Sequence, residues 1–106
     1  MLQEVDRQAV LEFQSRLTEI TPLLELRVFG SRAREDATEE SDLDLFIKVI
    51  ELSRSLREQI YDLAWEIGFK YDRVISTFVV TESQIEQGIV GASPLLSKVL
   101  TEGIIV

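Results

Sequence analysis

Apolar residues at the start of the chain recur with the period of an α-helix. From Leu2 to Ile20 they are three or four residues apart, as on the buried face of an amphipathic helix. Pro22 ends this pattern, because proline disfavours the helical conformation in the residue before it. The next segment, 23–29, alternates apolar and polar side chains and stops at Gly30, which predicts a β-strand.

The middle of the chain predicts a loop, a strand, a helix and a further strand in turn. Segment 31–41 is polar and charged, which is typical of a loop or a short helical turn, and segment 42–49 alternates as a second strand does. Apolar residues at helical spacing predict a helix over 52–67, and Gly68 stands where a C-terminal cap glycine is common. Segment 73–80 is rich in β-branched residues and predicts a third strand.

The C-terminal part carries two signals for the start of a helix. Thr81 is followed three residues later by Gln84, which predicts a capping box and a short helix. Pro94 after Ser93 favours a second helix start, with proline at the first helical position, and Gly103 would end that helix. The last three residues, Ile-Ile-Val, fit an edge strand or a docked tail.

This order of elements predicts a single domain over residues 1–106. The fold class is α/β (α+β): a small mixed β-sheet with helices packed mainly on one face. A chain of 106 residues suffices for one such domain. No apolar stretch is long enough for a membrane span, and we expect a cytoplasmic protein without membrane partners.

The composition narrows the chemistry. The net charge is −8, and a surface this negative disfavours broad binding to nucleic acid. The chain has no cysteine and no histidine, which excludes disulfides, thiolate zinc sites and every mechanism that needs an imidazole. Any catalysis must therefore use carboxylates, hydroxyls, Arg or Lys, and a hard metal ion.

The second predicted strand presents two acids together. Its odd positions 43–49 are all apolar, so they form the core face, and Asp42 and Asp44 project from the opposite face. Strand geometry puts their Cβ atoms roughly 6.5–7 Å apart, close enough for both carboxylates to reach one Mg²⁺. Alone, an Asp-x-Asp at a strand start is more often a turn or a solvated surface, and a Gly-Ser after a strand is most often just a turn.

The Gly-Ser pair and the Asp-x-Asp pair are more informative together, because of the spacing between them. Residues 28–49 are VFGSRAREDATEESDLDLFIKV, with Gly30-Ser31 after one strand and Asp42-Leu43-Asp44 on the next. This segment resembles the signature of the DNA polymerase β-type nucleotidyltransferase superfamily, in particular its minimal bacterial and archaeal members (MNT domains). The resemblance is dense over 28–49 and extends more loosely to the end of the chain.

The resemblance implies a nucleotidyltransferase-like fold and a Mg-nucleotide site, with ATP as the nucleotide. Gly30 and Ser31 would bind phosphates through backbone N–H groups and the serine hydroxyl, and Asp42 and Asp44 would be catalytic residues that hold Mg²⁺. Arg32 and Arg34 can reach phosphate oxygens, although both are also compatible with a solvated loop that balances the neighbouring acids.

Two positions depart from the family pattern. The family has a third carboxylate on a later strand, commonly three residues before the Thr that opens the next helix, where this chain has Phe78. Asp72 is a weak candidate that requires a different strand start or register, and a strand-start or turn carboxylate explains it better. Glu35 replaces a glycine that often follows the Ser-Arg-Ala-Arg segment. Both departures lower the expectation of catalysis more than that of the fold.

The resemblance also implies a partner. Small members of the family are often paired with a helical HEPN-domain protein, acting as the antitoxin of that toxin by modifying it with AMP. The alternative is a catalytically weak or inactive nucleotide-binding module that neutralises a partner by complex formation. Tyr61 and Trp65 are four residues apart on the predicted helix and form a packing pair or an exposed stripe for a partner. Self-association is left open.

Overall fold

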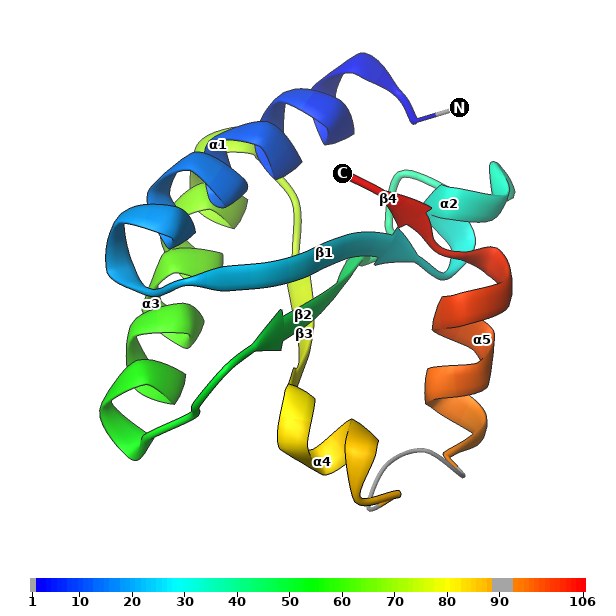
Figure 1. Ribbon diagram of the computed structural model, residues 1–106. Helices are drawn as coiled ribbons and strands as arrows, with labels where there is room; N and C mark the ends of the chain where they lie inside the picture. The colour runs from blue at the N-terminus through cyan, green and yellow to red at the C-terminus, as the bar shows by residue number, and fades with distance from the viewer. Residues whose placement is uncertain (1, 89–92) are drawn as a thin grey trace.

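The computed structural model describes residues 2–88 and 93–106. Within these residues it has five helices and four strands (Figure 1). They are α1 (Glu4–Ile20), β1 (Leu23–Phe29), α2 (Ser31–Arg34), β2 (Leu43–Val49), α3 (Arg54–Tyr71), β3 (Ile75–Thr81), α4 (Glu82–Glu86), α5 (Pro94–Glu102) and β4 (Ile104–Ile105). The predicted order of elements is confirmed. Of the alternatives left open, segment 31–41 begins with the short helix α2, and the C-terminal residues form an edge strand.

The four strands form one mixed sheet in the order β3-β2-β1-β4. β1 pairs antiparallel with β2 and with β4, and β2 pairs parallel with β3. A parallel pair needs a long crossover connection, which α3 supplies. The register sets Asp44 of β2 opposite Phe29 on one side and Ser76 on the other.

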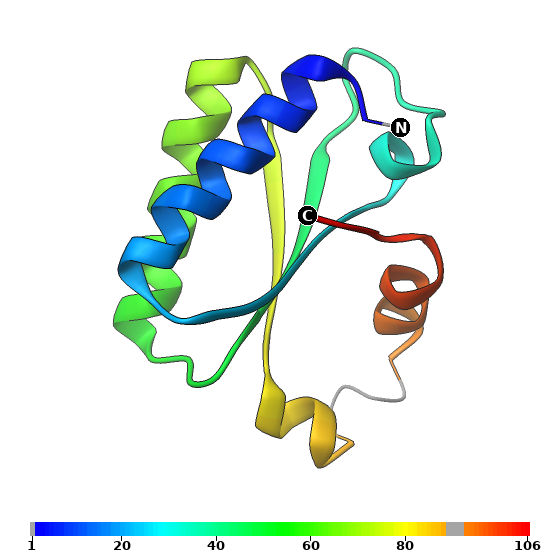
Figure 2. The ribbon, with the colours of Figure 1, turned by 45° about the horizontal axis from the view of Figure 1, so that its top comes forward.

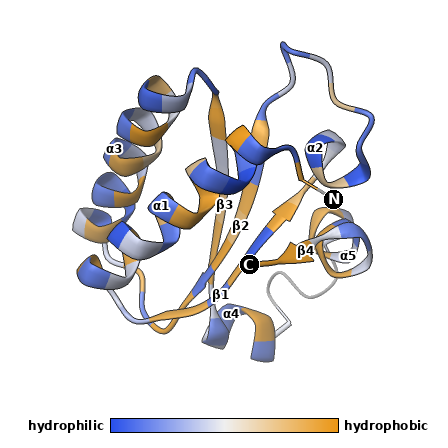
Figure 3. Cartoon of the chain, turned by 90° about the horizontal axis from the view of Figure 1, so that it is seen from above, coloured by the Kyte–Doolittle hydropathy of each residue, from blue (hydrophilic) through white to orange (hydrophobic). Residues whose placement is uncertain are grey.

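The two long helices, α1 and α3, cover one face of this sheet (Figure 2). The odd positions of β2, predicted to be the core face, are fully buried there: Leu43, Leu45, Ile47 and Val49. Hydrophobic residues follow the strands in Figure 3, whereas the connection from α2 to β2 is hydrophilic. The alternation in the sequence therefore placed the main core correctly.

The opposite face of the sheet has a smaller core of its own. Phe46 points to this face, the same face as Asp44, and is completely buried against Val80, Leu96 and Val99. The last two residues belong to α5, so this helix packs on the face that the two long helices leave open (Figure 1). Asp44 thus lies on a partly covered face of the sheet, whereas Asp42 is exposed and precedes β2, which begins at Leu43, one residue later than predicted.

The end of α3 differs from the prediction. The helix continues past Gly68 to Tyr71, and Asp72 caps it in the left-handed conformation with φ 56°. Gly68 is a glycine for a steric reason, because a Cβ atom there would lie 2.5 Å from the carbonyl oxygen of Arg73. The backbone N–H of Arg73 donates to the carbonyl of Gly68 at 2.8 Å. Gly68 therefore lets the chain pass closely as it turns into β3.

Asp6 is a buried acid on the inward face of α1, only 1% exposed.

In the part of the chain that the structure describes, no helix is both long and apolar enough to cross a membrane.

Candidate nucleotide and metal site

Gly30 brings the end of β1 into contact with Asp44 of β2. Its backbone has φ 74° and ψ −159°, a conformation that is essentially restricted to glycine. A Cβ atom at this position would lie 2.3 Å from Oδ2 of Asp44, closer than nonbonded atoms can approach. Both the conformation and the space therefore require glycine, and the carboxylate of Asp44 lies directly against the turn.

The turn leads into α2, which begins at Ser31. The backbone N–H groups of Ala33 and Arg34 both donate to the carbonyl of Gly30. By helix geometry, the earlier N–H groups of this first turn have no partner within the helix. They are the backbone donors that the glycine-serine pair was predicted to offer to phosphate oxygens.

Asp44 is a half-buried carboxylate with a raised pKa. Burial is the largest cause, the negative charge of Asp42 adds to it, and the positive charge of Arg34 opposes it. The two aspartates are thus close enough to interact electrostatically, at the junction between the 35–42 connection and β2. A bound cation would counteract both causes of the raised pKa. It would replace the hydration that Asp44 loses on burial and would offset the repulsion between the two carboxylates.

This donor set fits a magnesium ion that is bound together with a nucleotide. Mg²⁺ in such sites usually takes one or two carboxylates and completes its shell with phosphate oxygens and water. The described residues contain no group of three or more acidic side chains arranged to hold a metal ion. The chain itself therefore offers two carboxylates, and the remaining ligands would come from the nucleotide and solvent.

Arg32 is buried and faces the protein interior. Its guanidinium donates to the carboxylate of Asp6 at 3.1 Å and to the backbone carbonyls of Thr38 and Ser41. The sequence suggested a phosphate contact or a solvated loop for this residue, and the structure provides neither, since only 4% of Arg32 is exposed. Instead, Arg32 fixes the connection that leads to Asp42.

Asp6 is the centre of a cluster that the sequence analysis missed. It accepts hydrogen bonds from Arg32 and, at 2.8 Å, from Nε of Arg73. The cluster ties α1 to α2 and to the connection between α3 and β3, the segments that flank the candidate site. One signal was available: Asp6 falls three residues before Ala9 and seven before Phe13, on the apolar face of its helix.

Arg34 stays near the two aspartates and is partly exposed. Its guanidinium pairs with Asp36 at 3.3 Å and with Glu102 of α5 at 3.0 Å. The hydrogen bond to Glu102, and then the one to Asp36, raise the pKa of Arg34. Because its charge also acts on Asp44, Arg34 is the better placed of the two predicted arginines for contact with a phosphate.

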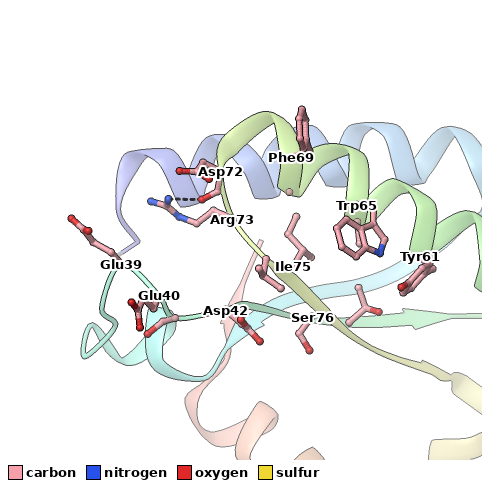
Figure 4. Close-up of a pocket in the computed structure, with 15 residues that line it drawn as sticks. Glu39, Glu40, Asp42, Tyr61, Trp65, Phe69, Asp72, Arg73, Ile75 and Ser76 are labelled. Carbon is pink, nitrogen blue, oxygen red and sulfur yellow. Dashed lines mark hydrogen bonds between the residues drawn. The ribbon is translucent and has the colours of Figure 1, made fainter.

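The position of a third carboxylate is taken by other side chains. On β3, Ser76 lies opposite Asp44, and Phe78 lies opposite Phe46 with the ring centroids 5.7 Å apart. Asp72 caps α3, and Figure 4 shows it at the far end of the helix and directed away from Asp42. The structure does not bring Asp72 to the aspartate pair.

A groove of about 1030 Å³ has Asp42 in its lining, but not Asp44 (Figure 4). Its walls come from the connection that precedes β2, from α3 and from the beginning of β3. Asp42 and Ser76 belong to its lining, and so do Tyr61, Trp65 and Phe69 of α3. The groove therefore adjoins the candidate site through Asp42.

A comparison with protein-family models decides the family of this chain. Residues 8–106 match the model of the nucleotidyltransferase domain. The chain belongs to this family. The match includes the turn at Gly30, the aspartate pair and the C-terminal helix and strand, so the resemblance inferred from residues 28–49 is confirmed.

Solved structures agree with this assignment. A protein assigned as a minimal nucleotidyltransferase is 29% identical, with a TM-score of 0.64, and the match covers 100% of this chain and 97% of that one. A toxin–antitoxin structure with AMP-PNP is 20% identical, with a TM-score of 0.64 and coverage of 92% and 69%. A complex from Shewanella oneidensis, a tri-AMPylated HEPN toxin with its MNT antitoxin, is 19% identical, with a TM-score of 0.58 and coverage of 94% and 70%. At this identity, the last two show the fold alone. The search of curated proteins found no match.

Proposed function

We propose that this nucleotidyltransferase domain transfers AMP from ATP, with Mg²⁺, to a hydroxyl group of a HEPN-type helical protein and so acts as the antitoxin of that partner. The observation that carries the proposal is the contact between Gly30 and Asp44, which joins a phosphate-binding turn to a metal-binding carboxylate. The partner is suggested by the names of the toxin–antitoxin structures that share the fold.

Each residue of the site has a role in this proposal. The backbone around Gly30 and the hydroxyl of Ser31 bind the β- and γ-phosphates, with Arg34 as a further donor. Asp42 and Asp44 hold Mg²⁺, which when bound neutralises the charge that develops on the leaving pyrophosphate. Arg32 acts indirectly, because it holds the carbonyls of Thr38 and Ser41 and thereby positions Asp42.

The transfer exchanges one P–O bond for another and releases the proton of the acceptor hydroxyl. The acceptor oxygen attacks the α-phosphorus, the bond from that phosphorus to the bridging oxygen of pyrophosphate breaks, and the hydroxyl proton leaves the acceptor. Since β3 offers Ser76 beside Asp44, the proton passes to water or to a group of the acceptor protein. This favours slow turnover.

The strand β3 has Ser76, not an acid, beside Asp44, and this favours a second candidate function. A domain with two acids and no third can bind one Mg-nucleotide and neutralise its partner by occlusion without transferring the nucleotide. Both functions predict a rise in melting temperature with Mg-ATP, which a domain unrelated to nucleotides would not give.

An experiment with labelled nucleotide distinguishes the transferase from the binding module. The protein is incubated with Mg²⁺, α-labelled ATP and a HEPN-type protein as the candidate acceptor, and label on that protein is measured. Label that is lost in Asp42→Asn and Asp44→Asn, and kept in the exposed control Asp62→Asn, supports transfer. A tight complex without label supports the binding module and rejects transfer.

A further inference from the structure

A row of aromatic side chains lies exposed on α3. Tyr61, Trp65 and Phe69 follow one another at intervals of four residues and are 59%, 65% and 91% exposed. Tyr61 and Trp65 pack edge to face with ring centroids 6.3 Å apart, and Val74, 68% exposed, extends the apolar surface beyond the end of the helix. Contiguous exposed aromatic surface of this kind is typical of a site that binds another molecule.

This row forms one wall of the groove beside the free edge of β3. Within the described sheet, β3 is the edge strand and pairs with β2 alone. In Figure 4, Asp42 and Ser76 point to the other side of β3 from Trp65 and Tyr61. The groove therefore bends around the strand edge, from the aromatic row to the face of the sheet that carries the candidate site.

The charge of the groove indicates what can occupy it. Its lining has four carboxylates, those of Glu39, Glu40, Asp42 and Asp72, against one guanidinium, that of Arg73. Arg73 is already bound to the buried Asp6, so the groove presents net negative charge to a ligand. A second copy of this chain, with its own net charge of −8, would be repelled, whereas a basic segment would be attracted.

We propose that this groove docks a basic segment of the acceptor protein that also carries apolar side chains, and that it presents the acceptor hydroxyl of that segment at Asp42. The apolar side chains pack on the aromatic row, the basic ones pair with Glu39 and Glu40, and the open edge of β3 is available to the backbone of the segment. Delivery of a hydroxyl rests on the proposed transferase function, while the docking itself depends on the groove alone.

Trp65 allows the groove to be tested directly, because it is the only tryptophan in the chain. The intact protein is titrated with a synthetic peptide of Lys and Leu residues around one Tyr, and the tryptophan emission is followed. The peptide should shift the emission to shorter wavelength in a saturable way. The same peptide with Glu in place of every Lys should not.

Matched variants locate the binding. Glu40→Lys reverses a charge in the groove and should weaken the peptide at least about tenfold. Glu19→Lys makes the same change at an exposed position at the end of α1 and should leave the affinity unchanged. Equal affinity of the two variants, or equal binding of the two peptides, would overturn the proposal.

Further results distinguish binding of the peptide in the groove from transfer of the nucleotide to it. Asp42→Asn should retain most of the peptide affinity while it loses transfer of label from ATP to the peptide tyrosine. If the wild type binds the peptide but transfers no label, the docking site stands and the transferase function fails. If Mg-ATP alone shifts the Trp65 emission and competes with the peptide, the groove is the binding site of the nucleotide base and the proposal is wrong.

Discussion

The absent side chain of Gly30 is required by both the fold and the candidate chemistry. In Gly30→Ala, backbone strain alone should lower the free energy of unfolding by about 1–3 kcal/mol. The new Cβ atom would also displace the Asp44 carboxylate, whose Oδ2 atom lies 2.3 Å from that position. The rise in melting temperature with Mg-ATP should therefore disappear, as thermal unfolding with and without Mg-ATP can show.

Gly88→Ala is the matched control for this substitution. Gly88 has the same φ of 74°, but nothing lies within 4 Å of the position of its Cβ atom. In this variant backbone strain alone should lower the free energy of unfolding, and the rise in melting temperature with Mg-ATP should remain. If both variants lose the response, the contact with Asp44 is not the cause.

Asp44→Asn should stabilise the nucleotide-free protein and abolish its response to Mg-ATP. The folded state raises the pKa of Asp44, so it holds the proton more tightly than the unfolded chain does. The stability from this group is present below its ordinary pKa and is lost as the pH rises through the raised value. At neutral pH the neutral Asn removes that cost, and we expect the melting temperature to rise by a few degrees.

The pH dependence checks this account of Asp44. The advantage of Asp44→Asn over the wild type should shrink as the pH falls toward the range where the carboxylate becomes protonated. An advantage that does not change with pH would mean that the charge of Asp44 is not its source.

The sequence predicted that Gly30 and Asp44 belong to one candidate site, because both residues lie in one short motif and the strands that carry them are neighbours along the chain. It could not predict the position of Arg32. The guanidinium is buried by its partner Asp6, which is 26 residues away in the sequence, and no local pattern distinguishes it from a solvated loop arginine. Arg34 stays near the surface, and its contact with a phosphate stays a prediction.

Among the elements, the contacts of Asp6 should be the most costly to break. Asp6→Ala would leave the guanidinium of Arg32 buried without its carboxylate, and loss of one partner from a buried ion pair costs about 3–5 kcal/mol. The exposed pair of Arg16 and Glu66, which joins α1 to α3, should contribute at most about 1 kcal/mol. Urea denaturation of Asp6→Ala and Glu66→Ala measures both.

A milder variant keeps this test informative if Asp6→Ala does not fold. Asp6→Asn retains one hydrogen-bond acceptor and should be less destabilised, with a weaker response to Mg-ATP because the connection to Asp42 is less firmly held. Equal losses in Glu66→Ala and Asp6→Asn would contradict a special role for the buried cluster.

The sequence located the other helices and strands, but it left α2 as a loop or a helical turn and β4 as an edge strand or a docked tail. It was less accurate about the ends of the elements and their packing. The third strand begins at Ile75, two residues later than predicted, because Arg73 is occupied by a backbone bond to Gly68 and by its ion pair with Asp6. The packing of α5 on the second face of the sheet was not predicted. Phe46 shares that face with Asp44, and its burial depends on a helix some fifty residues further along the chain.

For the molecule as a whole, the negative charge is a cost to stability that function can explain. Six acids, and no basic residue, fall within 35–44, and this run leads directly to the candidate site and the groove. Like charges at this density repel one another in the folded state, and salt screens the repulsion. A chain selected for stability alone would not concentrate them here.

Removing two of these acids should therefore stabilise the protein in a salt-dependent way. Glu39→Gln combined with Glu40→Gln should raise the melting temperature at low ionic strength, and the gain should fade above about 0.5 M salt, where the screening length is only a few ångströms. Glu58→Gln is the control, because Glu58 pairs with Arg54 at 3.4 Å and its removal should bring no gain. A gain for the double variant that persists at high salt would refute long-range repulsion as its cause. The same double variant should bind the basic peptide more weakly, so that stability and docking change in opposite directions when the same two charges are removed.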